Sequence, residues 1–135
     1  MSEPLLRAPT LDDAVAVVAV VNEEALRWTG SNEVDADVVR GWWTQPAPFD
    51  LSEDVVVALR GTDVVGYGDL SDHATGGGVF WLDVRGAEED AILGELERRA
   101  RDRARPGAVI RTYAHAEDAE HRSRLESRGY VHVRS

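Results

Sequence analysis

The sequence predicts a single α+β domain over residues 1–135, with a mixed central sheet and helices on its faces. Three apolar segments between residues 54 and 84 follow one another with only short turns between them, which predicts antiparallel strands. A long amphipathic helix then separates the third segment from another strand, and such a helix allows that strand to run parallel to its neighbour. The length and the hydrophobic fraction of 43% suit one core.

The first third of the chain is expected to hold a short strand and two helices. Residues 5–8 form the strand, and residues 10–13 resemble a capping box that starts a helix reaching about Trp28. The many β-branched residues of this helix require tertiary burial. Its buried face is expected to carry Val15, Val18, Val21 and Ala25. A second helix is expected over residues 35–44, before the prolines of residues 45–48.

The middle of the chain predicts a β-hairpin and a third strand. Residues 54–60 and 64–70 flank Gly61-Thr62-Asp63, a composition typical of hairpin turns. Gly66 and Gly68 predict a bulge or the close approach of another segment. The third strand is expected over residues 79–84.

The clearest helix is expected over residues 88–105, where Leu96 lies on the apolar stripe and should be buried against the sheet. The stripe consists of Ile92, Leu93, Leu96 and Ala100. A strand over residues 109–114, a helix over residues 118–128 and a last strand over Tyr130–Val133 are expected to follow. The whole order is therefore β-α-α-β-β-β-α-β-α-β.

Composition excludes several classes of function. The formal net charge of −10, from 25 acidic and 15 basic residues, argues against nucleic-acid partners and against anionic membranes. No cysteine is present, so disulfides and thiol chemistry are excluded, and the four histidines lack the spacing of metal ligands, so no metal is expected. The N-terminus lacks the features of a signal peptide, and the apolar run Ala14–Val21 is too short to span a bilayer. A cytoplasmic protein is expected.

The element order and three local segments resemble the GCN5-related N-acetyltransferase (GNAT) superfamily. The segments are "PTLDDAVAVVAVVNE", "DVVVALRGTDVVGYGDL", which includes the common pair Val65-Gly66, and "RSRLESRGYVHV". The resemblance covers nearly the whole chain and implies the acyl-CoA N-acyltransferase fold. It is strongest to actinobacterial tandem proteins similar to mycothiol synthase, which carry two such domains and whose first domain is usually degenerate.

The resemblance implies that acetyl-CoA is the cofactor and that Leu82, Val84, Arg85 and Gly86 would line its site. In the family, a glycine-rich loop after this strand cradles the pyrophosphate at a helix N-terminus. Here the expected glycine is Glu88, the expected glycine or alanine is Asp90, and the connection is about four residues too short. Carboxylates in the first helical turn satisfy the helix dipole and repel phosphate, so we expect a closed site.

The catalytic positions also depart from the family. Leu125 stands where the family's tyrosine acid should lie, Asp118 lies near the position of a common asparagine, and Tyr130 is expected to face the core. Asp83 is a weak candidate for a general base, and Asp69 is a second.

The aromatic and basic residues have other expected roles. Trp28, Trp42 and Trp43 are candidates for lining an acceptor pocket, and one tryptophan of the Trp42-Trp43 pair is expected to stay exposed. The arginines of residues 98–105 are expected to pair with acids on their own helix rather than to bind a CoA phosphate.

The leading hypothesis is a degenerate, non-catalytic N-terminal half of a tandem acetyltransferase. One alternative is an active acetyl-CoA-dependent N-acetyltransferase of a small amine, and another is a ligand-binding or regulatory module on the same fold. The family usually ends with one more strand than the chain reaches at Ser135, so that final strand is expected to be missing. The open edge predicts a partner, either a second GNAT domain of the parent chain or a second copy in a homodimer.

Overall fold

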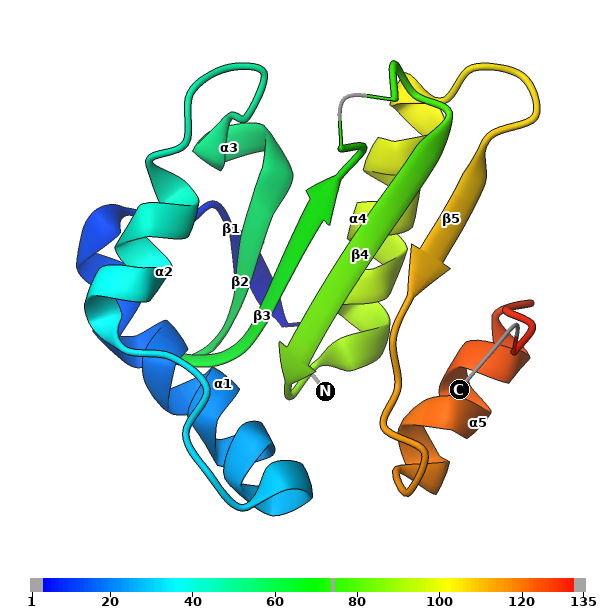
Figure 1. Cartoon of the computed structure of the whole chain (residues 1–135). Coiled ribbons are helices and arrows are strands. Elements are labelled where there is room, and N and C mark those ends of the chain that lie inside the picture. The colour runs from blue at the N-terminus through cyan, green and yellow to red at the C-terminus, as the bar shows by residue number, and fades with distance from the viewer. Residues whose placement is uncertain (1–3, 74, 133–135) are drawn as a thin grey trace.

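A computed structural model describes residues 4–73 and 75–132. Its centre is a five-stranded sheet in the order β1-β2-β3-β4-β5 (Figure 1). Neighbouring strands from β1 to β4 are antiparallel, and β5 runs parallel to β4. The strands are β1 (Leu5–Arg7), β2 (Val55–Arg60), β3 (Asp63–Ser71), β4 (Val79–Gly86) and β5 (Val109–Thr112). The predicted mixed sheet and α+β class are confirmed.

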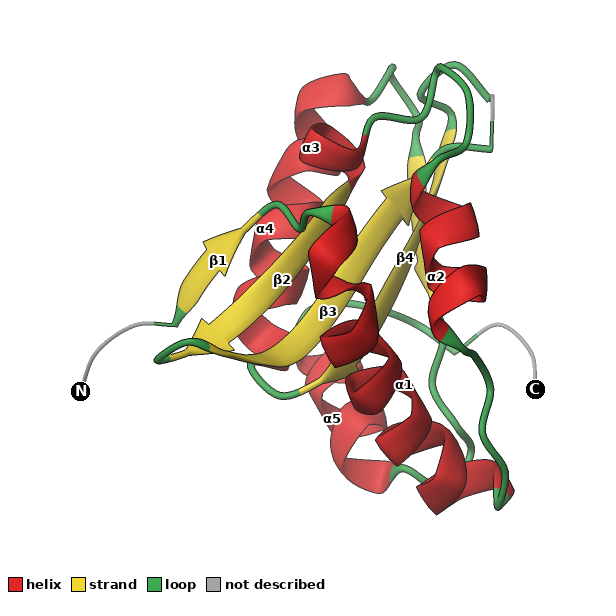
Figure 2. Ribbon diagram, turned by 90° about the vertical axis from the view of Figure 1, so that its left-hand side faces the viewer, coloured by secondary structure: helices red, strands yellow, loops and turns green. Residues whose placement is uncertain are grey.

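The helices cover both faces of this sheet. In Figure 2, α1 and α2 lie on one face and α4 lies on the other. The helices are α1 (Ala14–Thr29), α2 (Ala36–Trp43), α3 (Leu51–Asp54), α4 (Glu89–Arg103) and α5 (Ala119–Ser127), and a 3₁₀ turn, Leu11–Asp13, precedes α1. The Asp13 carboxylate accepts from the Thr10 amide at 2.8 Å, as expected for a capping box. None of the described helices is both long and apolar enough to cross a membrane.

Each face of the sheet has its own hydrophobic core. On the α4 face, the predicted stripe is fully buried, and Leu96 packs with Phe80 and Leu82 of β4. On the other face, α1 and α2 pack on β2 and β3 around Tyr67 and Trp43. The α1 face agrees with the expected one in part: Val21 and Ala25 are buried, but Val15 is 63% exposed while Val17 and Val20 are buried.

Two glycines of β3 let α4 approach the sheet closely. A Cβ atom at Gly66 would lie 2.1 Å from the carbonyl oxygen of Ala87, and one at Gly68 would lie 2.4 Å from Cγ2 of Ile92. The register also shifts beside Gly66, between Ala58 and Leu59 of β2. Both the bulge and the close approach are therefore present, and together they fix where α4 begins.

The last predicted strand is wrong over its described part. Tyr130–His132 is not a strand, and Val133 lies outside the described residues. The Tyr130 amide instead donates to the Leu125 carbonyl at 3.0 Å, which closes the end of α5. The Tyr130 hydroxyl donates to Glu97 of α4 at 2.9 Å, and its ring packs against the core, so it faces the core as expected.

Candidate functional site

The junction of β4 with α4 keeps one feature of an open site. β5 pairs with β4 through Val79–Leu82, so within the described part of the chain residues 83–86 have no strand beside them on that side. The side chains of Leu82 and Val84 are buried in the α4 core, whereas Arg85 lies on the opposite face. Only Ala87 and Glu88 join β4 to α4, which agrees with the short connection expected from the sequence.

Glu88 holds a backbone conformation that favours glycine. Its φ of 62° lies in the left-handed region, which non-glycine residues adopt rarely and at a cost of roughly 1 kcal/mol. This is the position at which the family resemblance predicts a glycine. The Glu88 carboxylate accepts from the Arg60 guanidinium of β2 at 2.7 Å, so this side chain is paired at the protein surface.

Glu89 connects the start of α4 to α5 through its carboxylate. Its side chain is only 9% exposed, and Arg124 donates to its carboxylate at 2.8 Å. His121 contacts the same carboxylate through Nδ1, and its Nε2 lies 2.8 Å from the carbonyl oxygen of Tyr113. Burial lowers the pKa of His121, partly against the effect of the Tyr113 carbonyl. His121 therefore lies half-buried between α5 and the start of α4.

The third carboxylate is that of Asp90, whose Oδ1 lies 3.6 Å from Nη1 of Arg128. Arg128 also donates to the buried Glu97 through Nε at 3.2 Å. The cations around the α4 N-terminus thus already have carboxylate partners from the chain itself. A pyrophosphate could contact them only by displacing those partners.

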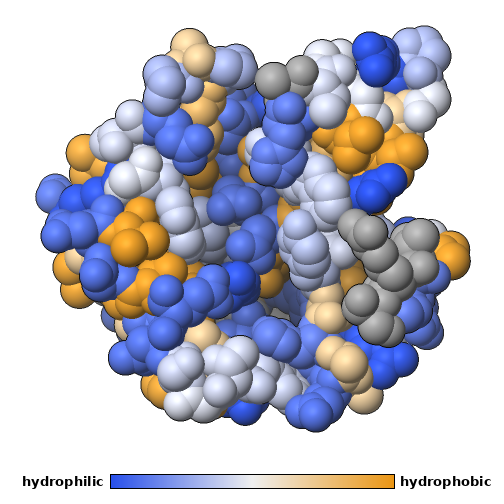
Figure 3. Space-filling view, viewed as in Figure 1, coloured by the Kyte–Doolittle hydropathy of each residue, from blue (hydrophilic) through white to orange (hydrophobic). Residues whose placement is uncertain are grey.

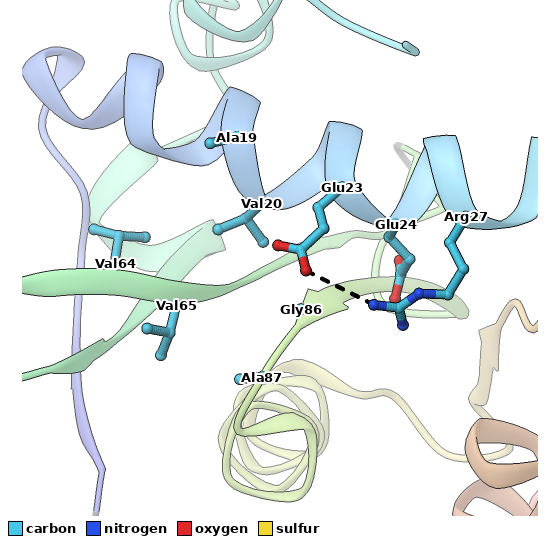
Figure 4. Close-up of a pocket in the computed structure, with 9 residues that line it drawn as sticks. All are labelled: Ala19, Val20, Glu23, Glu24, Arg27, Val64, Val65, Gly86 and Ala87. Carbon is cyan, nitrogen blue, oxygen red and sulfur yellow. Dashed lines mark ion pairs between the residues drawn. The ribbon is translucent and has the colours of Figure 1, made fainter. Parts of the chain in front are cut away.

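The cavity nearest to Gly86 is acidic as well. It measures about 470 Å³ and lies between α1 and the loop that precedes α4 (Figure 4). Glu23 and Glu24 project into it with Arg27, which pairs with Glu23 at 3.7 Å. Burial raises the pKa of Glu24, against the lowering effect of Arg85. Such a lining disfavours a phosphate.

A second cluster lies on the sheet face that α1 and α2 cover only in part. Asp83 of β4 stands directly opposite Asp69 of β3. The Tyr67 hydroxyl donates to Asp69 at 2.6 Å, and Arg85 donates to Asp83 through Nε at 2.8 Å. Burial and the facing Asp83 carboxylate raise the pKa of Asp69 to about 7, partly offset by Tyr67. The sheet register therefore brings together both carboxylates that the sequence marks as candidate bases.

Arg85 links this cluster to the helical side. Its Nη1 donates to Glu33 at 2.9 Å, and its Nε lies 3.8 Å from Glu24. Figure 3 shows a hollow with hydrophilic walls over the middle of this face. A half-buried carboxyl with a pKa near neutrality can exchange a proton with a bound group, which is what general acid–base chemistry requires.

Comparison of this fold with known proteins identifies its class. No protein-family model matches the sequence, and no curated protein is significantly similar to it. Solved structures do match: a GCN5-related N-acetyltransferase from Sphaerobacter thermophilus superposes with a TM-score of 0.79 at 18% identity, over 95% of this chain. The chain has the GNAT fold.

Two further structures agree. The ribosomal-protein-alanine N-acetyltransferase from Brucella melitensis gives a TM-score of 0.73 at 24% identity, over 93% of this chain and 83% of its own. The PaiA N-acetyltransferase from Thermoplasma acidophilum, solved in complex with coenzyme A, gives 0.63 at 15% identity, over 96% of this chain and 91% of its own. The chain spans only 43% of the Sphaerobacter protein.

The remaining candidates have structural partners on this GNAT fold. Leu125 is buried beside α4, and Asp118 caps α5 by accepting from the His121 amide at 3.0 Å. Arg98 pairs with Glu95 and Asp102, as expected. Arg103 differs, because it reaches Asp54 at 2.6 Å.

The tryptophans are distributed differently from the prediction. Trp42 and Trp43 both lie beside Tyr67, with ring centroids 6.5 and 6.3 Å away, so the pair does not leave one residue free on the surface. Trp28 stacks on His115 at 5.9 Å. Sequence reasoning missed a further aromatic pair, Trp81 of β4 and Tyr113 just after β5, because only the fold brings the two residues together.

Proposed function

We propose that this chain is a GNAT-fold domain without a working acetyl-CoA site, which serves as the non-catalytic N-terminal half of a larger acetyltransferase. The observation that supports this proposal is that the carboxylates at the start of α4 are paired with arginines of the same chain. There Glu88, Glu89 and Asp90 pair with Arg60, with Arg124 and with Arg128 of the same chain. The resemblance of the sequence to tandem acetyltransferases supports a place for this domain beside a catalytic one.

A phosphate ligand at the start of α4 would compete with ion pairs that the protein already makes. A pyrophosphate placed at the α4 N-terminus would have to separate the three carboxylates from their arginine partners, and each carboxylate left unpaired would repel it by a few kcal/mol at an effective dielectric of about 20. It would also have to separate Glu89 from α5, and that carboxylate is buried. Removing one partner of a buried ion pair is strongly unfavourable, because the other charge is left without compensation.

Acetyl-CoA is therefore expected to bind weakly or not at all. Isothermal titration calorimetry should give a dissociation constant above roughly 1 mM. Micromolar affinity would contradict the proposal and would favour the alternative, an active N-acetyltransferase.

A pair of matched variants tests whether carboxylates cause the weak binding. The double substitution Glu88→Gly and Asp90→Ala removes two acids at the α4 N-terminus and places glycine at the left-handed position. It should raise acetyl-CoA affinity about ten-fold or more. The control, Asp102→Ala with Glu126→Ala, removes two exposed acids elsewhere and should change nothing. Equal effects of both doubles would mean that only net charge matters.

The partner is proposed to dock on the outer edge of β5. This strand ends the sheet, and among the described residues no further strand pairs with it. Val109 at the start of β5 and Tyr113 just after its end are exposed. An uncovered sheet edge offers main-chain donors and acceptors to another strand.

In the isolated chain, this edge is expected to pair with a second copy. Sedimentation velocity should show self-association at about tens of micromolar, an order of magnitude typical of a weak interface. Val109→Lys should restore the monomer, because a charged edge residue opposes pairing. Leu11→Lys, on an exposed residue far from β5, is the control and should leave association unchanged. A strict monomer at several hundred micromolar would remove the edge from the proposal.

One observation favours the active alternative. Asp69 of β3 has a pKa of about 7 and faces Asp83 of β4. Asp83 lies just beyond Leu82, where the pairing of β4 with β5 ends. In an active enzyme, Asp83 or Asp69 would take the proton of an acceptor amine, and Leu82, Val84, Arg85 and Gly86 would line the acetyl-CoA site. The same acetyl-CoA titration decides between the two functions.

A further inference from the structure

We propose that the outer edge of β5 selects an extended partner segment in which one acidic residue, placed opposite Arg111, is flanked on both sides by apolar residues. This inference rests on the sheet-edge docking proposed above, and it names the chemistry of the segment that docks. It also predicts that a second copy of the chain is the weaker occupant of the same edge, which lies beyond β4 in Figure 1.

The acidic residue is inferred from Arg111, an exposed residue of β5. Its guanidinium carbon lies 5.5 Å from the Trp81 ring centroid, and Arg111 stands opposite Trp81 in the β4–β5 pairing. Within the described part of the chain, this guanidinium pairs with no carboxylate. The ring holds the cation on one face of the sheet. A residue directly across an added strand would share that face, at a Cβ–Cβ distance of roughly 5 Å.

The apolar neighbours of this acid follow from the alternation along β5. Ile110 and Thr112 are half-buried, and Ile110 packs against the core on the α4 side. Val109, Arg111 and the following Tyr113 are exposed instead. On an added strand, the two residues next to the acid would point to the Ile110 side and extend this core. The residues two positions from the acid would lie beside Val109 and Tyr113, where apolar side chains fit as well.

The β5 strand of a second copy does not supply the acid. Residues 108–115, which contain β5 and its two ends, include no aspartate and no glutamate. Pairing of this segment with itself therefore places Arg111 opposite an uncharged residue, a histidine or another arginine. Like charges directly across a sheet are destabilising, and the other registers leave the cation without a carboxylate. We therefore expect the homodimer to stay weak.

Three designed peptides test the charge requirement by calorimetry with the full chain. KIVEVIK carries the acid at its centre, KIVQVIK replaces it by a neutral side chain of similar shape, and KIVKVIK replaces it by a cation. We expect KIVEVIK to bind with a dissociation constant below about 1 mM. KIVQVIK should bind about two- to five-fold more weakly, the range of a partly exposed ion pair, and KIVKVIK more weakly still. The net charge of −10 attracts cationic peptides at long range, so the expected order requires a local contact.

A charge reversal on the protein assigns that contact to Arg111. Arg111→Glu should invert the order, so that KIVKVIK binds best and KIVEVIK binds worst. Arg101→Glu, at an exposed position of α4, changes the net charge by the same amount and is the matched control. This control should keep the native order. Circular dichroism checks that both variants are folded.

Equal affinity of the native chain for KIVEVIK and KIVQVIK would overturn the inference, as would the native order in folded Arg111→Glu. No binding of any peptide at 5 mM, roughly five times the expected limit, would overturn it too. Sedimentation of the native chain and of Val109→Lys separates this failure from that of the proposed function. Self-association that Val109→Lys abolishes would keep the sheet edge as an interface and reject only the acidic partner, whereas a strict monomer would reject the edge as well.

Discussion

Replacing Leu96 by alanine should lower the free energy of unfolding by about 2–5 kcal/mol, the range of large-to-small changes in cores. Leu96 is fully buried on α4 between the sheet and the rest of its stripe. The approach of α4 to β3 is already so close that a Cβ atom at Gly68 would lie 3.0 Å from Cδ1 of Leu96. Ile92 holds the same helix against the sheet nearby, so the backbone has little room to collapse into the cavity. Urea denaturation followed by circular dichroism measures the change.

The exposed Val15 of α1 supplies the control. Val15→Ala also shortens an aliphatic side chain in a helix, but it opens no cavity and should change stability by less than about 0.5 kcal/mol. A similarly small change for Leu96→Ala would contradict the packing of α4 described above.

Titration of Asp69 should lower the stability of the domain as pH rises from about 4 to about 7. The pKa of Asp69 is about 7 in the folded protein, because burial and the facing Asp83 carboxylate oppose its ionisation, whereas its ordinary value is 3.8. Between these values the folded state holds a proton that the unfolded state has released, so each rise in pH favours unfolding. The loss is complete above the folded pKa and amounts to at most about 4 kcal/mol. Tyr67 and Arg85 both lower the pKa of Asp69, and the value of about 7 already contains their effect.

Asp69→Asn should flatten this part of the pH profile and raise stability above pH 7. Asparagine keeps an oxygen that can accept from the Tyr67 hydroxyl, so the change mainly removes the titration. Asp63→Asn, at the exposed start of the same strand, is the matched control and should keep the slope of the native protein. Urea midpoints at several pH values measure the effect, and the same slope in Asp69→Asn would assign it to another group.

Periodicity predicted the buried face of α4 correctly and that of α1 only in part, for one physical reason. The α4 stripe stands out because charged residues occupy the rest of that helix. Residues 14–21 are all apolar, so the pattern does not distinguish the face that includes Val17 and Val20 from the one that includes Val15. Only packing against β2 and β3 selects between them.

The candidate site was predictable in its residues but not in its contacts. The acids after β4 and the unusual connection could be read from the chain. Their partners could not, because Arg60 and Glu88 are 28 residues apart, and Glu89 and Arg124 are 35 apart. The sequence suggested bare carboxylates that repel phosphate, whereas the structure has carboxylates neutralised by the protein's own arginines. The facing of Asp69 and Asp83 depended on a strand register that composition does not specify.

Because α5 contacts the start of α4, α5 acts as a tethered competitor of any ligand that would bind there. His121 and Arg124 hold Glu89, and the chain keeps α5 at this place at an effective concentration that for short tethers reaches millimolar or more. A free ligand at the α4 N-terminus would therefore have to outcompete a part of the same molecule that cannot diffuse away. Any ligand that succeeded would have to break the contacts of His121 and Arg124 with Glu89, so occupancy of the α4 N-terminus and these contacts of α5 exclude each other.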